Sequence, residues 1–540
     1  MGSLAPKTVS SIARTSFPDI EATRIESLLR VLGSWFSHQW TRVLEHCHNP
    51  RLVAEAAVLV GVVGVGIWIR LHFASFLDPF EDGYQNWWIS SNLLQTGQYW
   101  DRHSMMTQGN WLPLYHFWGA AVLATAGWHN LDALKFANIL LSSLTTGLVY
   151  LVGRKTSAAV GLAAAAFLSL NFIDTVVSGW STAESLAVFL VFLGYACLFR
   201  FDPARPRNKW IGAAALTLAV LTRYEAWLVV GLIAVFMIAT QNRVSRRASL
   251  GCLVPAFAVM VGFSIYALQW GFLPDLIIRQ TSTDLRYQLS VGTQPGTLLL
   301  LSRFWTGYVG MLAGVFIVGG TYAVVRLRHD VGSWIILTLF GFVIAYTIFQ
   351  FGNPSFRYIM IGVPFLSLFA TEGLASAIRR AQHRTSDRQR RRSVLRAAVP
   401  LGIIVLAATL IVSPATYWAD GFELRKNMEP LQRAGQFLVG LPMPEGRLLI
   451  TESPIAAYYS GYPADRMLGS RWLPDDRASA LAFLQGRAAY IVYVGVPYYK
   501  LRVLFPELQN GTDTPNFEFL FDGGGLAIGT HAVFVYRVRG

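Results

Sequence analysis

The residues best suited to chemistry stand in one polar stretch, about residues 72–110, just after the first long apolar run. An adjacent acid pair, Glu81-Asp82, lies near its start, and His103, a candidate substrate-binding residue, lies further along among aromatic residues. A carboxylate in such a place can accept the proton of a substrate hydroxyl group. Outer loops of membrane proteins also carry acids and interfacial aromatic residues without a catalytic role, so the residue types alone leave both interpretations open.

A second set of ionisable residues stands within apolar sequence or at its borders. Such groups are costly in a membrane, and they usually mark a polar site or pair with one another. A structural Arg–Glu pair is the simpler interpretation, whereas an arginine facing an outer cavity would bind a lipid-linked phosphate through paired hydrogen bonds. We take the whole set as candidate substrate-binding residues: Asp174, Glu184, Arg223, Glu225, Arg357 and Tyr358.

The elements that must position these residues are membrane-spanning helices. Of the 540 residues, 53% are hydrophobic and 14% are charged, and the mean hydropathy is +0.41, whereas about a quarter of the residues in a soluble protein are charged. Apolar runs recur from about residue 52 to residue 414, most of them near the roughly 17–25 residues that cross a bilayer. The net charge of +14 does not indicate nucleic-acid binding, because the basic residues form short clusters between these runs.

The basic clusters predict the topology, because loops rich in Lys and Arg stay in the cytoplasm. They give about eleven spans, with the N-terminus inside and the C-terminus outside, and the membrane would be the plasma (inner) membrane if the source is prokaryotic. The first run, 52–71, follows a polar segment without a signal-peptide pattern, so we expect an uncleaved anchor. The run 111–128 would begin and end outside, which predicts a re-entrant or juxtamembrane helix. The segment 84–95 has apolar residues at helical spacing and predicts a helix on the membrane surface.

The last part of the chain differs in kind. Four short runs rich in β-branched and aromatic residues predict strands, and Asp476 to Gln485 predicts a helix between two of them. The fold class expected is therefore an all-α polytopic membrane domain followed by a small α/β domain. The expected organisation is a cytoplasmic segment (1–50), a transmembrane domain (51–414) and an exoplasmic or periplasmic α/β domain (415–540).

At four places, spread over roughly residues 52–375, the sequence resembles the GT-C superfamily of membrane glycosyltransferases, near its protein O-mannosyltransferase and aminoarabinose-transferase branches. The order, the spacing and the common outer side of the four segments make the set more specific than any one of them. The segments are Glu81-Asp82-Gly83-Tyr84 with the helix that follows, Asn110-Trp111-Leu112-Pro113-Leu114-Tyr115, Leu221-Thr222-Arg223-Tyr224-Glu225, and Phe356-Arg357-Tyr358 followed by Pro364.

The resemblance implies an inverting transferase that takes sugar from dolichyl or undecaprenyl phosphate. An acid of the first outer loop is the base in that superfamily, which implies Asp82 first and Glu81 second, while Arg223 and Arg357 would meet the phosphate charge. The family pair is often Asp-Glu, whereas Glu-Asp stands here. The Lys before Pro-Pro of one branch and the His-Pro-Pro of the other are absent, so the match names no sugar.

The partners implied are the lipid bilayer, the polyprenyl-phosphate sugar and a glycan, lipid or protein acceptor. No cofactor is expected beyond this lipid-linked donor, and the residues do not indicate a divalent metal. The competing class is a polytopic transporter or lipid-linked glycan flippase, which would also contain buried charges. Such proteins often have internal repeats with interrupted helices, and the sequence has none that we detect. A non-catalytic scaffold in glycan export is a third class.

Overall fold

The computed structural model describes residues 49–78, 81–97, 99, 112–202, 205–240, 249–269, 313–348, 356–384, 428–496, 499–526 and 531–540. The chain forms two compact units, Met1–Val60 and Gly61–Gly540. The boundary falls within the first described helix, and every later helix and strand that the structure describes belongs to the second unit.

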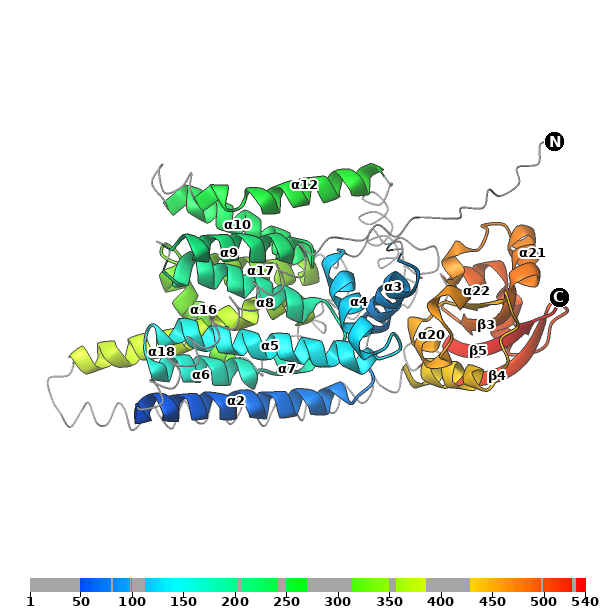
Figure 1. Ribbon diagram of the computed structural model, residues 1–540, viewed down its shortest axis with the longest axis horizontal. Helices are drawn as coiled ribbons and strands as arrows, with labels where there is room; N and C mark the ends of the chain where they lie inside the picture. Colours follow the sequence, from blue (N-terminus) through cyan, green and yellow to red (C-terminus); the bar gives the residue numbers. More distant parts are fainter. Residues whose placement is uncertain are drawn as a thin grey trace, which may run out of the picture. The chain divides into compact units, whose positions relative to one another are not determined.

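Where the structure describes them, the apolar runs expected between residues 52 and 414 fold as helices (Figure 1). Side-chain caps fix several starts: Asn130 accepts a hydrogen bond from the backbone N–H of Ala133, and Ser157 accepts one from that of Val160. The helical elements are α2 (Pro50–Ala74), α3 (Asp82–Thr96), α4 (Leu114–Ala126), α5 (Leu131–Arg154), α6 (Ala158–Ser169), α7 (Phe172–Val177), α8 (Glu184–Tyr195), η2 (Ala196–Arg200), α9 (Pro206–Val220), α10 (Tyr224–Thr240), α12 (Val254–Gln269), α16 (Ala313–Arg326), α17 (Val331–Ile348), η6 (Phe356–Gly362) and α18 (Val363–Arg384).

Four helices in the described part of the chain are long and apolar enough to cross a membrane: Pro50–Ala74, Leu131–Arg154, Ser249–Tyr266 and Ile359–Arg380. Ala158–Ser169 and Tyr224–Thr240 are shorter apolar helices. The helical, multi-span character predicted from composition is therefore confirmed. The count of about eleven spans stays a prediction, and the last expected span, at about residues 397–413, lies outside the described residues.

Helix α4 fits the re-entrant or juxtamembrane segment expected at 111–128. It has 13 residues, so it is about 20 Å long at 1.5 Å per residue, whereas the hydrocarbon core of a bilayer is about 30 Å thick. Helix α6 is about as short as α4. It differs because α7 follows it after only two residues and so extends the helical segment. The length of α4 fits a helix that does not cross the membrane, and its re-entrant or juxtamembrane position stays a prediction.

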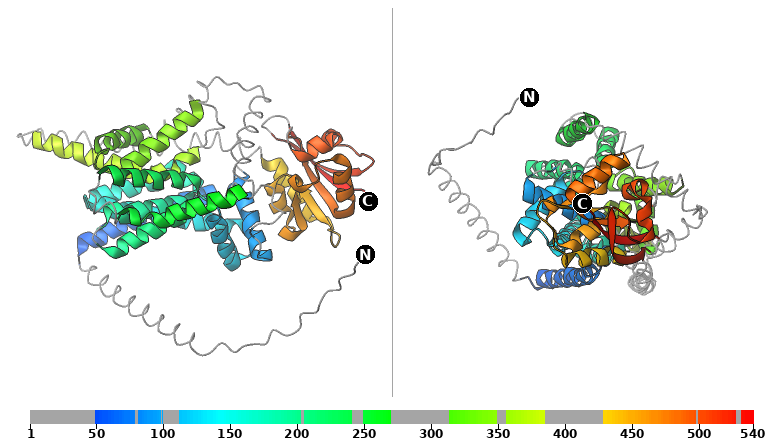
Figure 2. Two further views of the ribbon diagram at one scale, coloured as in Figure 1. Left: turned by 90° about the horizontal axis from the view of Figure 1, so that it is seen from above. Right: turned by 90° about the vertical axis from the view of Figure 1, so that its right-hand side faces the viewer.

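The helices pack through an apolar core and through close backbone contacts. Helix α5 packs against α6 and α8, and α8 packs against α9. The axes of these helices lie roughly parallel to one another, while the chain reverses its direction from α5 to α6 (Figures 1 and 2). One close approach joins α5 to α6, where a Cβ atom on Gly153 would lie 2.9 Å from the Cα atom of Gly161. Small residues that let helix backbones approach in this way are typical of helix contacts in membranes.

The C-terminal part contains a five-stranded sheet with the order β2-β1-β3-β5-β4. The strands are β1 (Leu448–Thr451), β2 (Met467–Gly469), β3 (Ala488–Val494), β4 (Phe517–Leu526) and β5 (His531–Val538). Short helices accompany them: α20 (Pro454–Ser460), α21 (Arg477–Arg487) and α22 (Lys500–Leu504). The four predicted strands are present as β1, β3, β4 and β5, and the predicted helix is α21. Strand β2 was not predicted, because three residues are too few to show a pattern.

Strand β1 pairs in parallel with β2 on one side and with β3 on the other, whereas β5 pairs antiparallel with β3 and with β4. The chain leaves β1 through α20 toward β2, then crosses through α21 to β3. In such sheets, the crevice at the carboxyl ends of the strands where the connections diverge is the common place for a ligand. Glu452 and Ser453 directly follow β1 at this end.

Candidate functional site

The acid pair lies where the first polar loop enters helix α3. Glu81 is the residue before the helix, Asp82 is its first residue, and both side chains are partly buried. The hydroxyl group of Ser453 donates a hydrogen bond to Oε1 of Glu81 at 2.8 Å. The C-terminal sheet domain thus supplies a direct contact to one of the two acids, although 372 residues separate the partners.

The surroundings of Glu81 change its acidity. Burial raises the pKa of Glu81, the hydrogen bond from Ser453 lowers it, and the charge of Asp82 raises it again, which together bring it to about 7. Burial also raises the pKa of Glu452 to about 8, with hydrogen bonds from Leu501 N–H and the Ser470 hydroxyl acting in the opposite direction. A carboxyl group that titrates near neutrality suits proton transfer at physiological pH.

Helix α3 joins the acid pair to the sheet domain through aromatic side chains. Tyr84, Trp87 and Trp88 are fully buried, and the Trp87 ring meets the Tyr458 ring edge to face at 4.8 Å between centroids. The backbone N–H of Ala464 donates to the side-chain oxygen of Gln95 at 3.1 Å. The helix predicted at 84–95 is therefore present, and residues 83–92 are all buried within protein. Its position at the membrane surface stays a prediction.

A buried ion pair fixes the loop ahead of α3. Lys135 Nζ lies 3.0 Å from Asp78 Oδ1, and both side chains are almost inaccessible to solvent. The same ammonium group donates to the backbone carbonyls of Ala74 and Phe76, each at 3.1 Å. Gly83 at the start of α3 packs against the Asp78 carboxylate, where a Cβ atom would clash. These contacts hold the end of α2 against α5 and set the position of the acid pair.

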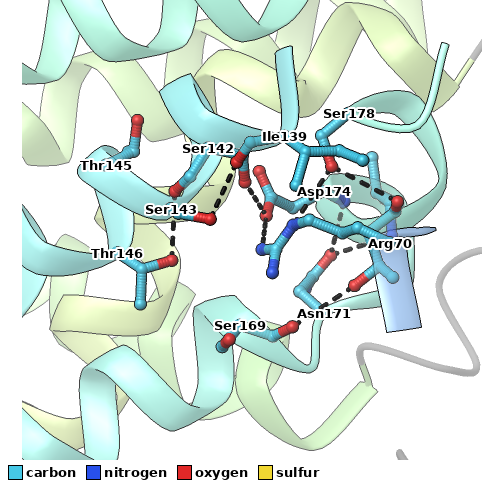
Figure 3. A network of polar contacts seen from close by, with 12 residues as sticks. Arg70, Ile139, Ser142, Ser143, Thr145, Thr146, Ser169, Asn171, Asp174 and Ser178 are labelled. Atoms are coloured by element: carbon cyan, nitrogen blue, oxygen red, sulfur yellow. Dashed lines mark hydrogen bonds and ion pairs between the residues drawn. The ribbon is translucent and has the colours of Figure 1, made fainter. Parts of the chain in front are cut away.

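Asp174 takes part in a second buried ion pair (Figure 3). Its carboxylate pairs with the guanidinium group of Arg70 from α2 and accepts a hydrogen bond from Ser142 Oγ at 2.7 Å. Arg70 Nε also donates to Ser178 Oγ at 3.1 Å. Arg70 and Asp174 are 0% and 1% exposed, so this predicted substrate-binding acid lies in a closed network that connects α2, α5 and α7.

Arg223 lies between two acids that were also candidates. Its guanidinium group makes a two-pronged contact with Glu225, Nη2 to Oε1 at 2.6 Å and Nε to Oε2 at 3.0 Å, and Nη1 lies 2.7 Å from Glu184 Oε1. One positive charge therefore faces two carboxylates. This arrangement matches the structural pairing that was the simpler interpretation, and it opposes binding of a further anion at the same nitrogen atoms.

Three of the four segments that carry the family resemblance meet at one end of the helices. The backbone N–H of Leu114 donates to the carbonyl of Leu221 at 2.9 Å, which joins the start of α4 to the turn before α10. Burial raises the pKa of the Tyr115 hydroxyl, a hydrogen bond from Asn138 lowers it, and the nearby charges of Glu184 and Asp78 raise it further. Tyr115 therefore lies between the Arg223 cluster and the loop that holds the acid pair.

A buried histidine connects α3 with α4 at this end. His116 Nε2 lies 3.0 Å from Asn86 Oδ1, and His116 Nδ1 lies 3.1 Å from the Tyr99 hydroxyl. Asn86 in turn donates to the carbonyl of Ser181 at 3.2 Å. Burial lowers the pKa of His116 to about 3, so the ring is neutral and connects the two helices through hydrogen bonds rather than through charge.

The remaining candidates are placed only in part. Arg357 and Tyr358 belong to η6, but their side chains lie outside the described residues, as does His103 altogether.

Residues that were not predicted from the sequence include Arg70, Lys135 and Ser453. A charged residue inside an apolar run was an available signal for the first two, whereas nothing near Ser453 indicated a partner so far away. Within the part of the chain that is described, no group of three or more His, Cys, Asp or Glu residues is arranged to hold a metal ion.

Comparison with known proteins gives matches by structure. ArnT from Cupriavidus metallidurans in the apo state has a TM-score of 0.54 and 15% identity, over 90% of this chain and 98% of that chain. The same protein bound to undecaprenyl phosphate has a TM-score of 0.52 and 15% identity, over 90% and 97%. The apo oligosaccharyltransferase of Archaeoglobus fulgidus has a TM-score of 0.50 and 13% identity, over 86% and 73%. No protein-family model and no curated protein sequence matches the chain.

The shared fold is that of ArnT and of the archaeal oligosaccharyltransferase. ArnT and the oligosaccharyltransferase both belong to the GT-C superfamily, and this chain has the GT-C fold over most of its length. The resemblance found in four short sequence segments is thereby confirmed at the level of the fold.

Proposed function

We propose that this protein is an inverting glycosyltransferase, which moves a sugar from a polyprenyl-phosphate donor to an acceptor hydroxyl group. The observation that carries the proposal is the acid pair, which begins helix α3 in a chain with the GT-C fold and is contacted by Ser453 from the C-terminal sheet domain. ArnT, whose structure matches 90% of this chain, has been solved bound to undecaprenyl phosphate. This match supports a polyprenyl phosphate as the carrier in the donor.

The reaction is a direct displacement at the anomeric carbon. A carboxylate of the pair takes the proton of the acceptor hydroxyl while the acceptor oxygen forms a bond to that carbon. The bond from the carbon to the phosphate oxygen breaks on the opposite side, and its electron pair leaves with the polyprenyl phosphate. Because phosphate is a good leaving group as an anion, one carboxylate suffices, whereas glycoside hydrolases use two.

Of the two acids, the surroundings favour Glu81 as the base over Asp82, which the sequence resemblance put first. Glu81 is oriented by the hydrogen bond from Ser453. Its pKa of about 7 lies near physiological pH, where a general base is most effective. Asp82 then contributes its negative charge, which helps to raise the pKa of its neighbour. The two roles are exchanged if Asp82 faces the acceptor instead.

The phosphate charge needs a cation, and Arg223 and Arg357 remain the proposed ones. Arg223 is already engaged by Glu184 and Glu225, so it would bind phosphate only if one of these acids moved away or took up a proton. Arg357 therefore takes the larger part in this proposal. Both residues would act by stabilising the negative charge that develops on the leaving group.

The experiment that tests the proposal offers the purified protein a panel of radiolabelled polyprenyl-phosphate hexoses and pentoses with glycan, lipid and peptide acceptors. Transfer of label to one acceptor, with inversion at the anomeric carbon, is expected. Label that crosses a vesicle membrane while it remains on the lipid would favour the flippase class instead. The proposal places the C-terminal domain on the outer (or lumenal) face of the membrane, which is the plasma (inner) membrane if the source is prokaryotic.

A further inference from the structure

One buried polar side chain beside the acid pair has no structural role that the described residues account for. Gln85 is 1% exposed, yet neither its amide nitrogen nor its amide oxygen has a hydrogen-bond partner among the described residues. Buried polar groups in proteins are nearly always paired, and each exception calls for a reason. An amide that is buried and unpaired on both atoms is costly to keep.

The place of Gln85 on α3 gives that reason. Its backbone N–H donates to the carbonyl of Glu81 at 2.9 Å, so the two residues are one helical turn apart and their side chains extend from the same face. The neighbouring faces are occupied otherwise: Tyr84 contacts the sheet domain through Tyr459, and Asn86 bonds to Ser181 and His116. Gln85 therefore presents one donor and one acceptor next to the proposed base.

A second unpaired group lies beside Glu81 on the C-terminal domain. Glu452 precedes the residue that contacts Glu81, it is 1% exposed, and its charge interacts with that of Glu81. Its Oε1 accepts hydrogen bonds from Ser470 and Leu501, and the backbone N–H of Val494 also lowers the pKa of this carboxyl group, whereas Oε2 has no well-formed hydrogen bond within the described ranges. Two separate elements thus bring unpaired hydrogen-bonding atoms to the neighbourhood of one acid.

We propose that Gln85, with Glu452 as the neighbouring group on the sheet domain, forms a subsite for a polyhydroxylated ring beside Glu81. An amide offers a donor and an acceptor at fixed spacing, which suits two adjacent hydroxyl groups of a sugar. This inference rests on the proposed function and identifies the ring as the sugar carried by the donor. Gln85 holds that sugar so that its anomeric carbon lies within reach of the acceptor oxygen.

The test compares Gln85→Met, which keeps the side-chain length and removes both polar atoms, with wild-type protein and with Ser90→Ala as a matched control. Ser90 is also on α3, fully buried, and has a hydroxyl group without a partner among the described residues. It packs against Gly119 of α4 instead. Gln85→Leu serves as a second apolar variant in case methionine packs poorly.

Two readouts separate a ligand-binding role from a structural one. Without ligand, we expect Gln85→Met to keep or raise the Tm, by about 1–3 °C, because it removes an uncompensated buried amide. In wild type, we expect undecaprenyl-phosphate hexoses or pentoses to raise the Tm more than undecaprenyl phosphate alone does. In Gln85→Met, we expect this extra increase to disappear and kcat/KM to fall roughly 10- to 100-fold. Ser90→Ala should match wild type in both ligand responses.

A fall in the Tm of both ligand-free apolar variants would show that Gln85 has a structural partner, and it would overturn the subsite. Wild-type kcat/KM in Gln85→Met would overturn it as well and would leave the glycosyltransferase proposal intact. If the wild-type protein transfers no sugar from any lipid of the panel, the proposed function fails. The subsite is then tested by thermal unfolding alone, as the difference in Tm between wild-type protein with sugar-bearing lipid and with bare lipid. If wild type shows no such difference, the subsite is overturned.

Discussion

Replacing Ser453 by alanine removes the hydrogen bond that the C-terminal domain donates to Glu81. That bond is 2.8 Å long and favours the charged carboxylate, and a hydrogen bond to a charged group contributes about 1.5–3 kcal/mol. Partial replacement by water leaves a loss of roughly 1.4 kcal/mol, which corresponds to about one pH unit. We therefore expect the pKa of Glu81 to rise from about 7 toward roughly 8.

The sign of the effect on rate follows from the role of a base. Glu81 acts only when it is deprotonated, so kcat/KM rises with pH through its pKa and reaches a plateau above it. About half of the wild-type protein is active at pH 7, and about a tenth of Ser453→Ala would be, which is roughly a fivefold loss that disappears above about pH 9. The assay is sugar transfer measured across this pH range.

Two variants control for damage to the fold, since Ser453 also caps α20 through Ala456 N–H. Ser453→Thr keeps a hydroxyl group and should restore the wild-type profile. Ser460→Ala, at the other end of α20, removes a buried hydroxyl that donates to the carbonyl of Ala457, and it should not move the acidic limb. A Ser453→Ala profile that coincides with wild type, or moves to lower pH, would refute the contact as a determinant of the base.

Three further predictions concern stability and topology. Asp174→Asn leaves the buried guanidinium of Arg70 without its counter-ion and should destabilise the protein by about 3–5 kcal/mol, whereas replacing both by apolar residues should recover much of this loss in thermal unfolding. Glu452 binds a proton more tightly when folded, with a pKa of about 8 against 4.5, so stability falls as pH rises between these values. Glu452→Gln should therefore raise the Tm at pH 9 and change it little at pH 4, and an equal gain at both would contradict the raised pKa. Reporter fusions after Arg396 and at the C-terminus should report inside and outside; the same compartment for both would refute the topology.

Much of the fold could be predicted because it follows from local patterns. The apolar runs at about residues 131–151, 226–240 and 332–351 gave the positions of α5, α10 and α17 to within a few residues. Short runs rich in β-branched and aromatic residues gave four of the five strands. Strand β2 and the short helices around it could not be found, because three to seven residues carry too little periodicity. The protein partners of α3 could not be predicted, since Trp87 and Trp88 suit a membrane surface as well as a protein interface, and the sequence does not show that Tyr458 packs against Trp87.

The site was predictable in its residues but not in its connections. The pairing of Arg223 with Glu225 could be anticipated because the two are near in sequence, and Glu184 completes it through the tertiary fold. The pairing of Arg70 with Asp174 and the contact from Ser453 to Glu81 join positions that are over a hundred and several hundred residues apart. Nothing in the local composition encodes such partners, because they are fixed by how α2, α7 and the sheet domain pack.

The central claim is that one carboxylate of the pair is the base of a sugar transfer from a polyprenyl-phosphate donor. The most direct measurement is single-turnover transfer of radiolabelled sugar by wild type, Glu81→Gln and Asp82→Asn, with donor binding measured in parallel. Wild-type protein should transfer the sugar, and Glu81→Gln should be slower by on the order of 10²–10⁴ while it still binds the donor lipid. Asp82→Asn should lose much less. The reverse order would assign the base to Asp82, and near-normal transfer by both variants would contradict the mechanism.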